Sequence, residues 1–159
     1  MSRVSPTKPV LHASEHLYGG NDKLTGMRVL LDNTETDTAE TNTTTNETTN
    51  YTYTLPINSY SKILIEACFQ SRYEVDTASK ANFTWRIKYN GATQKTFTGK
   101  IIALSTSGCD TGGKVNEYIS YIMNGGQASA ADITITGQTD VSNANVGFIL
   151  KFARVWGII

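Results

Sequence analysis

A strict alternation of apolar and polar side chains over residues 82–89, NFTWRIKY, places the strongest constraint on the fold of this chain. Successive side chains of a β-strand point to opposite faces, so a period of two indicates a strand with one buried face. The face predicted to be buried holds Phe83, Trp85, Ile87 and Tyr89. The opposite face, predicted to meet solvent, holds Thr84, Arg86 and Lys88. Trp85 is therefore expected in the core and Arg86 outside it.

The strand runs directly into Asn90-Gly91, a dipeptide that favours a two-residue type I′ turn because both of its residues tolerate positive φ. The segment ATQKTF follows at once. Residues 82–97 are therefore predicted to form a β-hairpin.

Several further segments have strand character and are separated by turn-forming stretches such as SGCDTGG and TGQTDVSNA. They are residues 26–31, 51–55, 62–70, 100–105, 115–123, 131–136 and 145–157. No window has the periodicity of an amphipathic helix. About eight short strands joined by turns predict an all-β chain, a single antiparallel jelly-roll-like β-sandwich over residues 26–159. The last segment is apolar on both faces, which predicts a central strand or one whose second face a neighbouring subunit covers.

Two segments lie outside this pattern. Residues 1–25 are polar, carry Pro6 and Pro9, and are predicted to form an extended N-terminal arm. The tract over residues 33–54 is half threonine and lacks basic residues, so its first part, about 33–50, is predicted to be an exposed loop.

Charge and hydropathy exclude several classes of partner. The 14 basic and 14 acidic residues cancel, which removes the field that would attract nucleic acid or anionic lipid. No apolar run approaches the roughly 20 residues that span a bilayer. The first residues also lack the apolar core of a secretory signal. We therefore expect synthesis in the cytoplasm, with no nucleic-acid partner and no membrane insertion.

Enzymatic and metal-binding interpretations depend on residues 12–22. HASEH matches the H-x-x-E-H pattern of a class of zinc proteases, but that chemistry needs a helix that this segment does not predict. A metal site formed by His12, His16 and Asp22 is less demanding, and the alternative is that these side chains pack or form hydrogen bonds. Neither cysteine has the setting of a nucleophile, so no catalytic residue and no cofactor is predicted.

Cys68 and Cys109 are a candidate disulfide pair; the alternative is a buried thiol at Cys68 and a loop cysteine at Cys109. Asn42, Asn46 and Asn50 each begin an N-x-T triplet and are candidate glycosylation sites. A tract so rich in Asn and Thr also produces such triplets by composition alone. Asn82 begins a fourth triplet, but it opens a strand.

The segment HASEHLYGGNDKL, residues 12–24, resembles an H-x-x-x-H-x-x-G-G-x-D-x-[LI] segment of structural and appendage proteins of tailed phages and archaeal viruses. The closing NVGFILKFARVWGII is similar to the last strand of such virion domains, and IKYNGATQKTF is similar to their central hairpins. The Thr-Asn tract departs from their pattern.

The resemblance implies a non-enzymatic structural protein of a virus particle, made in the host cytoplasm and located in the virion. It implies an arm that docks on neighbouring subunits through His12, His16, Tyr18, Gly19, Gly20 and Asp22. The expected partners are other copies in a symmetric trimer or pentamer that assembles through the arm and the sheet edges, other virion proteins, and a glycan or receptor on the host surface.

The alternative function is a carbohydrate-binding or cell-surface β-sandwich module. Aromatic rings on a sheet surface provide platforms for sugars, although tyrosines of a sandwich also occupy cores and interfaces. The tyrosines considered for this role are Tyr51, Tyr53, Tyr60, Tyr73, Tyr118 and Tyr121.

Overall fold

The computed structural model describes residues 27–35, 41–42, 45–57, 60–73, 81–101, 113–126, 129–140 and 146–159. Within these residues the chain contains strands and no helix, so the all-β prediction is confirmed. The strands are β1 (Arg28–Thr34), β2 (Thr41–Asn42), β3 (Thr48–Leu55), β4 (Lys62–Tyr73), β5 (Ala81–Tyr89), β6 (Ala92–Ile101), β7 (Gly113–Asn124), β8 (Ala131–Thr139) and β9 (Val146–Ile158).

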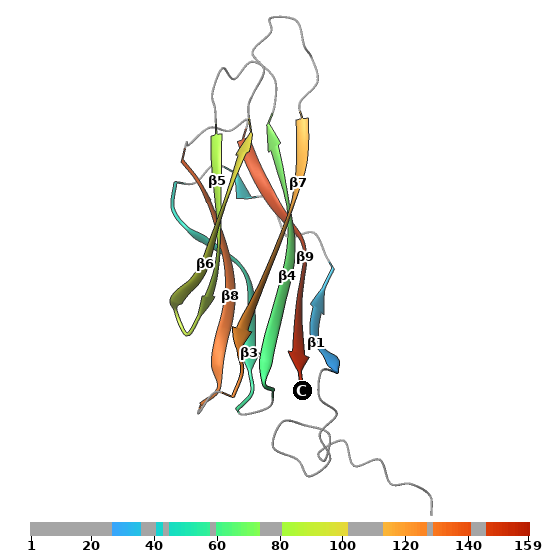
Figure 1. Ribbon diagram of the computed structural model, residues 1–159. Coiled ribbons are helices and arrows are strands. Elements are labelled where there is room, and N and C mark those ends of the chain that lie inside the picture. Colours follow the sequence, from blue (N-terminus) through green and yellow to red (C-terminus); the bar gives the residue numbers. More distant parts are fainter. Residues whose placement is uncertain are drawn as a thin grey trace, which may run out of the picture.

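The strands form two antiparallel sheets that face each other in a sandwich (Figure 1). Sheet A has the order β1-β9-β4-β7, and the short β2 also pairs with β9. Sheet B has the order β3-β8-β5-β6. Successive strands cross repeatedly between the sheets, and the two four-strand orders are those of an eight-strand jelly roll with β2 added at one edge. The prediction of a jelly-roll-like sandwich is thus confirmed.

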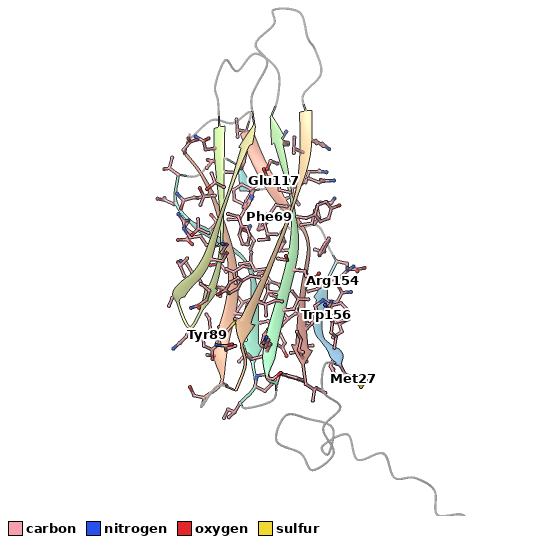
Figure 2. The ribbon with its side chains drawn as sticks, viewed as in Figure 1. Met27, Phe69, Tyr89, Glu117, Arg154 and Trp156 are labelled. Atoms are coloured by element: carbon pink, nitrogen blue, oxygen red, sulfur yellow. The ribbon has the colours of Figure 1, made fainter. Side chains whose placement is uncertain are left out.

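The core between the sheets is built by the alternating faces that the sequence predicted. Trp85 is 1% exposed and its ring stacks on that of Phe69, with centroids 3.9 Å apart. Phe83 and Phe148 complete this aromatic cluster with edge contacts. Figure 2 shows Phe69 between the two layers. Gly137 lies against the rings of Trp85 and Phe148, where a Cβ atom would come within 2.6 Å of Trp85, so this position requires glycine.

The predicted hairpin is present. β5 and β6 pair antiparallel around a turn in which Asn90 has φ 47° and Gly91 has φ 76°. Both values lie in the left-handed region that a type I′ turn requires. The predicted strand at 100–105 differs, because its first two residues instead extend β6 to Ile101 and the rest lie outside the described residues.

Parts of the predicted exposed loop at about 33–50 are strand. β1 continues to Thr34, Thr41–Asn42 form β2, and β3 begins at Thr48. The physical reason is edge pairing: main-chain groups of this polar tract pair with β9 and β8, so no apolar face of its own is needed.

A side-chain hydrogen bond joins the two sheets between β1 of sheet A and β3 of sheet B. The Tyr51 hydroxyl of β3 donates to Asp32 Oδ2 of β1 over 2.6 Å. Burial, followed by the neighbouring Asp32 carboxylate, raises the pKa of Tyr51 well above its usual value. The neutral hydroxyl is therefore the form that the folded state favours.

Candidate functional site

The outer face of sheet A, which points away from the core, carries apolar side chains in register across all four of its main strands. Directly paired residues of antiparallel strands share a face. The pairs Leu30 with Trp156, Trp156 with Leu64, and Leu64 with Ile122 therefore form one continuous row. We call this the apolar row, and its members in the order β1-β9-β4-β7 are Leu30, Trp156, Leu64 and Ile122.

Much of the apolar row is open to solvent. Leu30 is 45% exposed and Ile122 is 53% exposed, whereas Leu64 at the centre is buried. The orientation of the Trp156 ring in this row is fixed by a hydrogen bond, in which the indole N–H donates to Glu66 Oε2 over 2.8 Å. Exposed apolar surface is a feature of many protein interaction sites, so the apolar row is a candidate contact surface.

The next row along the strands is charged. Its members are Asn33, Arg154, Glu66 and Ser120, so opposite charges lie side by side at its centre. Arg154 Nε donates to Asn33 Oδ1 over 3.0 Å, and a second guanidinium nitrogen pairs with Glu35. The hydrogen bond from Arg154 holds the pKa of Glu35 below its usual value. Figure 2 shows Arg154 and Trp156 on the side of β9 next to β1.

The third row is aromatic. Phe152 and Tyr118 flank Cys68, and their rings approach each other with centroids 6.2 Å apart. Arg154 lies 4.6 Å from the centre of the Phe152 ring, a cation–π contact. Tyr118 is 72% exposed, whereas Cys68 beneath the rings is buried. Burial raises the pKa of the Cys68 thiol, so its reactive thiolate form is disfavoured.

The charged and aromatic rows enclose a shallow hollow of about 250 Å³ on this face. Its lining includes Glu66, Tyr118, Phe152 and Arg154. The hollow thus combines two aromatic rings with one cation and one carboxylate. These groups allow stacking, ion pairing and hydrogen bonding with a partner.

The outer face of sheet B has the opposite chemistry. One row of this face, here called the threonine row, consists of Thr52, Thr134, Lys88 and Thr93. Glu47 lies over the neighbouring strands, 2.8 Å from Lys88 Nζ and hydrogen-bonded to Thr136. Although partial burial opposes ionisation, the hydrogen bonds from Lys88 and Thr136 leave the pKa of Glu47 below its usual value.

The predicted arm residues and the predicted metal ligands lie outside the described residues, and the structure does not test them. They are His12, His16, Tyr18, Gly19, Gly20 and Asp22. Within the described ranges, no three His, Cys, Asp or Glu side chains are placed to hold a metal ion. Cys109 is also outside those ranges, so a Cys68–Cys109 bridge stays a prediction.

The candidate glycosylation sites fall in different settings. Asn42 belongs to β2, Asn46 is exposed in a bend and Asn50 lies in β3 with partial burial. The Asn82 side-chain amide donates to Asp140 Oδ2, an interaction that a glycan on this nitrogen would remove.

The tyrosines considered as sugar platforms separate into two groups. Tyr51 and Tyr60 are buried in the core, and Tyr53 and Tyr121 pack against it. Tyr118 is exposed on the surface, and the structure does not describe the side chain of Tyr73. The sequence did not single out the apolar row, because its members come from four segments whose register only the folded sheet reveals.

Comparison with known proteins gives little to guide function. No protein-family model matches this chain, and no curated protein is similar to it. The solved structure of dimeric latent PorU from Porphyromonas gingivalis is similar over 87% of this chain, with 12% identity and a TM-score of 0.45. The chain spans 13% of the length of that structure. A similarity this low carries no argument about function.

In the segments that the structure describes, no helix is long and apolar enough to cross a membrane.

Proposed function

We propose that this chain is a non-enzymatic structural protein of a virus particle, a jelly-roll subunit that assembles with copies of itself and with other virion proteins. The observation that carries the proposal is the apolar row on the outer face of a jelly-roll sheet. Jelly rolls are common building blocks of virus shells, although lectins and other proteins also use them. The resemblance of residues 12–24 to virion proteins adds a second line of support.

An exposed apolar face costs solubility in an isolated monomer, but it is expected in a subunit whose face is covered after assembly. The neutral net charge of the chain is also compatible with packing many copies side by side. Attachment to a host surface belongs to the same proposal as an additional role.

The test uses virus particles purified from cultures that express the gene. Antibodies raised against the recombinant chain should decorate intact particles in immunogold electron microscopy, and peptides of the chain should appear in mass spectra of the washed particles. Particles that lack both signals, while a known shell protein is detected in the same sample, would contradict the proposal.

The arm provides a separate test. Removal of residues 1–25 should leave the sandwich folded, because the core residues of the structure all lie beyond it, yet weaken association with neighbouring subunits. Replacing Gly19 and Gly20 by Val should weaken association similarly, because Val resists positive φ at a cost of about 1 kcal/mol or more. A truncated chain that fails to fold, or that assembles like the full chain, would remove the arm from the proposal.

The hollow favours a second candidate function, carbohydrate binding. Tyr118 and Phe152 offer rings for stacking, and Arg154 and Glu66 lie within reach of sugar hydroxyls. A glycan array with the full chain should then give binding that Tyr118→Ala abolishes. Binding that survives this change would place any sugar site elsewhere.

A further inference from the structure

The outer face of sheet A has an approximate internal symmetry. A line parallel to the strands, between β9 and β4, divides the apolar row and the charged row into matching halves. In the apolar row, Trp156 and Leu64 lie next to this line, and Leu30 and Ile122 lie one strand further out on either side. If a second copy is rotated by 180° about this line and placed on the first, each apolar side chain of the row therefore meets an apolar side chain of the other copy.

The charged row obeys the same relation with charges of opposite sign. Arg154 of β9 and Glu66 of β4 lie at equal distances on either side of the line. Rotation of a second copy by 180° about that line would place Glu66 of one copy over Arg154 of the other, twice. At the two outer strands of the row, Asn33 of one copy would meet Ser120 of the other. These contacts also join polar groups.

We propose that the outer face of sheet A packs on the same face of a second copy of this chain, across a two-fold axis parallel to the strands between β4 and β9. In this arrangement β9 of each copy lies on β4 of the other, and β1 lies on β7. A face that fits itself in this way forms an isologous contact, which closes on itself after two copies.

The charges select this axis over the alternative. The alternative two-fold axis runs across the strands, along the charged row. Rotation about it would place the apolar row of one copy on the aromatic row of the other, which also joins apolar surfaces. It would, however, place Arg154 on Arg154 and Glu66 on Glu66. Like charges opposed at an interface are strongly unfavourable, whereas the parallel axis pairs opposite charges.

Both charged groups retain the capacity for such pairing. A guanidinium offers five N–H donors, and the bonds from Arg154 to Asn33 and Glu35 use only part of this set. Glu66 accepts the Trp156 indole N–H at Oε2, and its other carboxylate oxygen is an additional acceptor. Neither group has to break its contacts within the chain to bind the second copy.

This inference deepens the proposed role as an oligomeric subunit. The two-fold contact joins two copies, so it predicts an even number of chains, whereas the trimer or pentamer expected from the sequence would use the sheet edges or the arm. Detection of the chain in virus particles together with a monomer in solution would leave the proposed function standing and would overturn this inference. The same face cannot hold a sugar at the Tyr118 hollow while a second copy covers it.

Disulfide cross-linking tests the axis. In full-length protein with Cys68→Ala and Cys109→Ser, the pair Leu30→Cys and Ile122→Cys is introduced and the protein is oxidised. Within one chain these positions are three strand spacings apart, about 14 Å, which is too far for a disulfide, so a bond between them must join two copies. We expect a covalent dimer on a non-reducing gel that disappears on reduction.

The matched control is Thr52→Cys with Thr93→Cys. These two positions are the ends of the threonine row, on the two edge strands of sheet B. This control should give no more dimer than the cysteine-free background. Equal cross-linking by both pairs, or none by the Leu30 and Ile122 pair, would overturn the proposed axis.

A charge-swap experiment tests the pairing independently of oxidation. Arg154→Glu alone and Glu66→Arg alone should each weaken self-association about tenfold or more in sedimentation equilibrium, because each creates two like-charge contacts. An equimolar mixture of the two variants should associate again, because every contact between unlike copies then joins opposite charges. Single variants that associate as the unmodified chain does, or a mixture that stays dissociated while both variants keep folded circular dichroism spectra, would overturn the inference.

Discussion

The outer faces of the two sheets are both built from rows of side chains paired across four strands, but the row on sheet A is apolar and the row on sheet B is polar. Sheet A has Leu30, Trp156, Leu64 and Ile122 in register across its strands, and sheet B has Thr52, Thr134, Lys88 and Thr93. Both faces cover the same core, so stability of the sandwich does not require the outer face of sheet A to be apolar. Threonine and lysine occupy the corresponding row on sheet B, and this difference motivates the proposal that the outer face of sheet A serves in contact rather than in folding.

The largest effect is expected from the core, where neither outer face is involved. Trp85→Ala should lower the free energy of unfolding by about 3–5 kcal/mol, because the ring is buried and stacked on Phe69. Trp156→Ala, on the outer face of sheet A, should cost clearly less stability and instead reduce association. Denaturant unfolding and sedimentation of both variants check the comparison, and equal losses of stability would mean that Trp156 belongs to the core.

A smaller effect is expected from the bond that joins the sheets. Tyr51→Phe should lower the free energy of unfolding by about 1 kcal/mol at neutral pH, the net contribution of a typical hydrogen bond. Since the pKa of Tyr51 is raised in the folded state, its contribution is fully present below the unfolded pKa of about 10 and is lost as pH rises beyond it. Unfolding midpoints measured on both sides of that pH should therefore fall more for the unmodified chain than for the variant. Parallel curves would contradict the assignment.

The smallest effect concerns the ion pair on the outer face of sheet B. Glu47→Gln should cost about 0.5 kcal/mol near pH 7, a value limited by solvent screening. The pKa of Glu47 is lowered in the folded state, so its contribution is present above the unfolded pKa of about 4.3 and is lost as pH falls through the folded value. Thermal unfolding of the two proteins should thus converge in acid. A difference that persists below pH 3 would show that the loss is not electrostatic.

The sequence predicted those elements whose signal is local. The alternation of 82–89 and the Asn90-Gly91 turn identified the β5–β6 hairpin with its buried and exposed faces. The apolar character of both faces of β9 predicted a central strand, and β9 lies between β1 and β4. These patterns are visible because one segment alone determines them.

Other features depend on pairing between distant segments. β2 was missed because two polar residues have no periodicity, and their main-chain pairing with β9 creates the strand. The apolar row joins residues from β1, β4, β7 and β9, so Leu30 and Ile122 could not be related before the register was known. The hollow around Tyr118 was out of reach of the sequence for the same reason.

The central claim, that the outer face of sheet A and not that of sheet B is a contact surface, is tested most directly by a pair of lysine substitutions. Ile122→Lys and Thr93→Lys each place one charge on an edge strand, at an exposed position of opposite faces. In sedimentation velocity of the full chain, the unmodified protein and Thr93→Lys should associate alike, and Ile122→Lys should sediment as a smaller species with an unchanged melting temperature. An Ile122→Lys protein that associates as the unmodified chain does, or an equal loss with Thr93→Lys, would contradict the account.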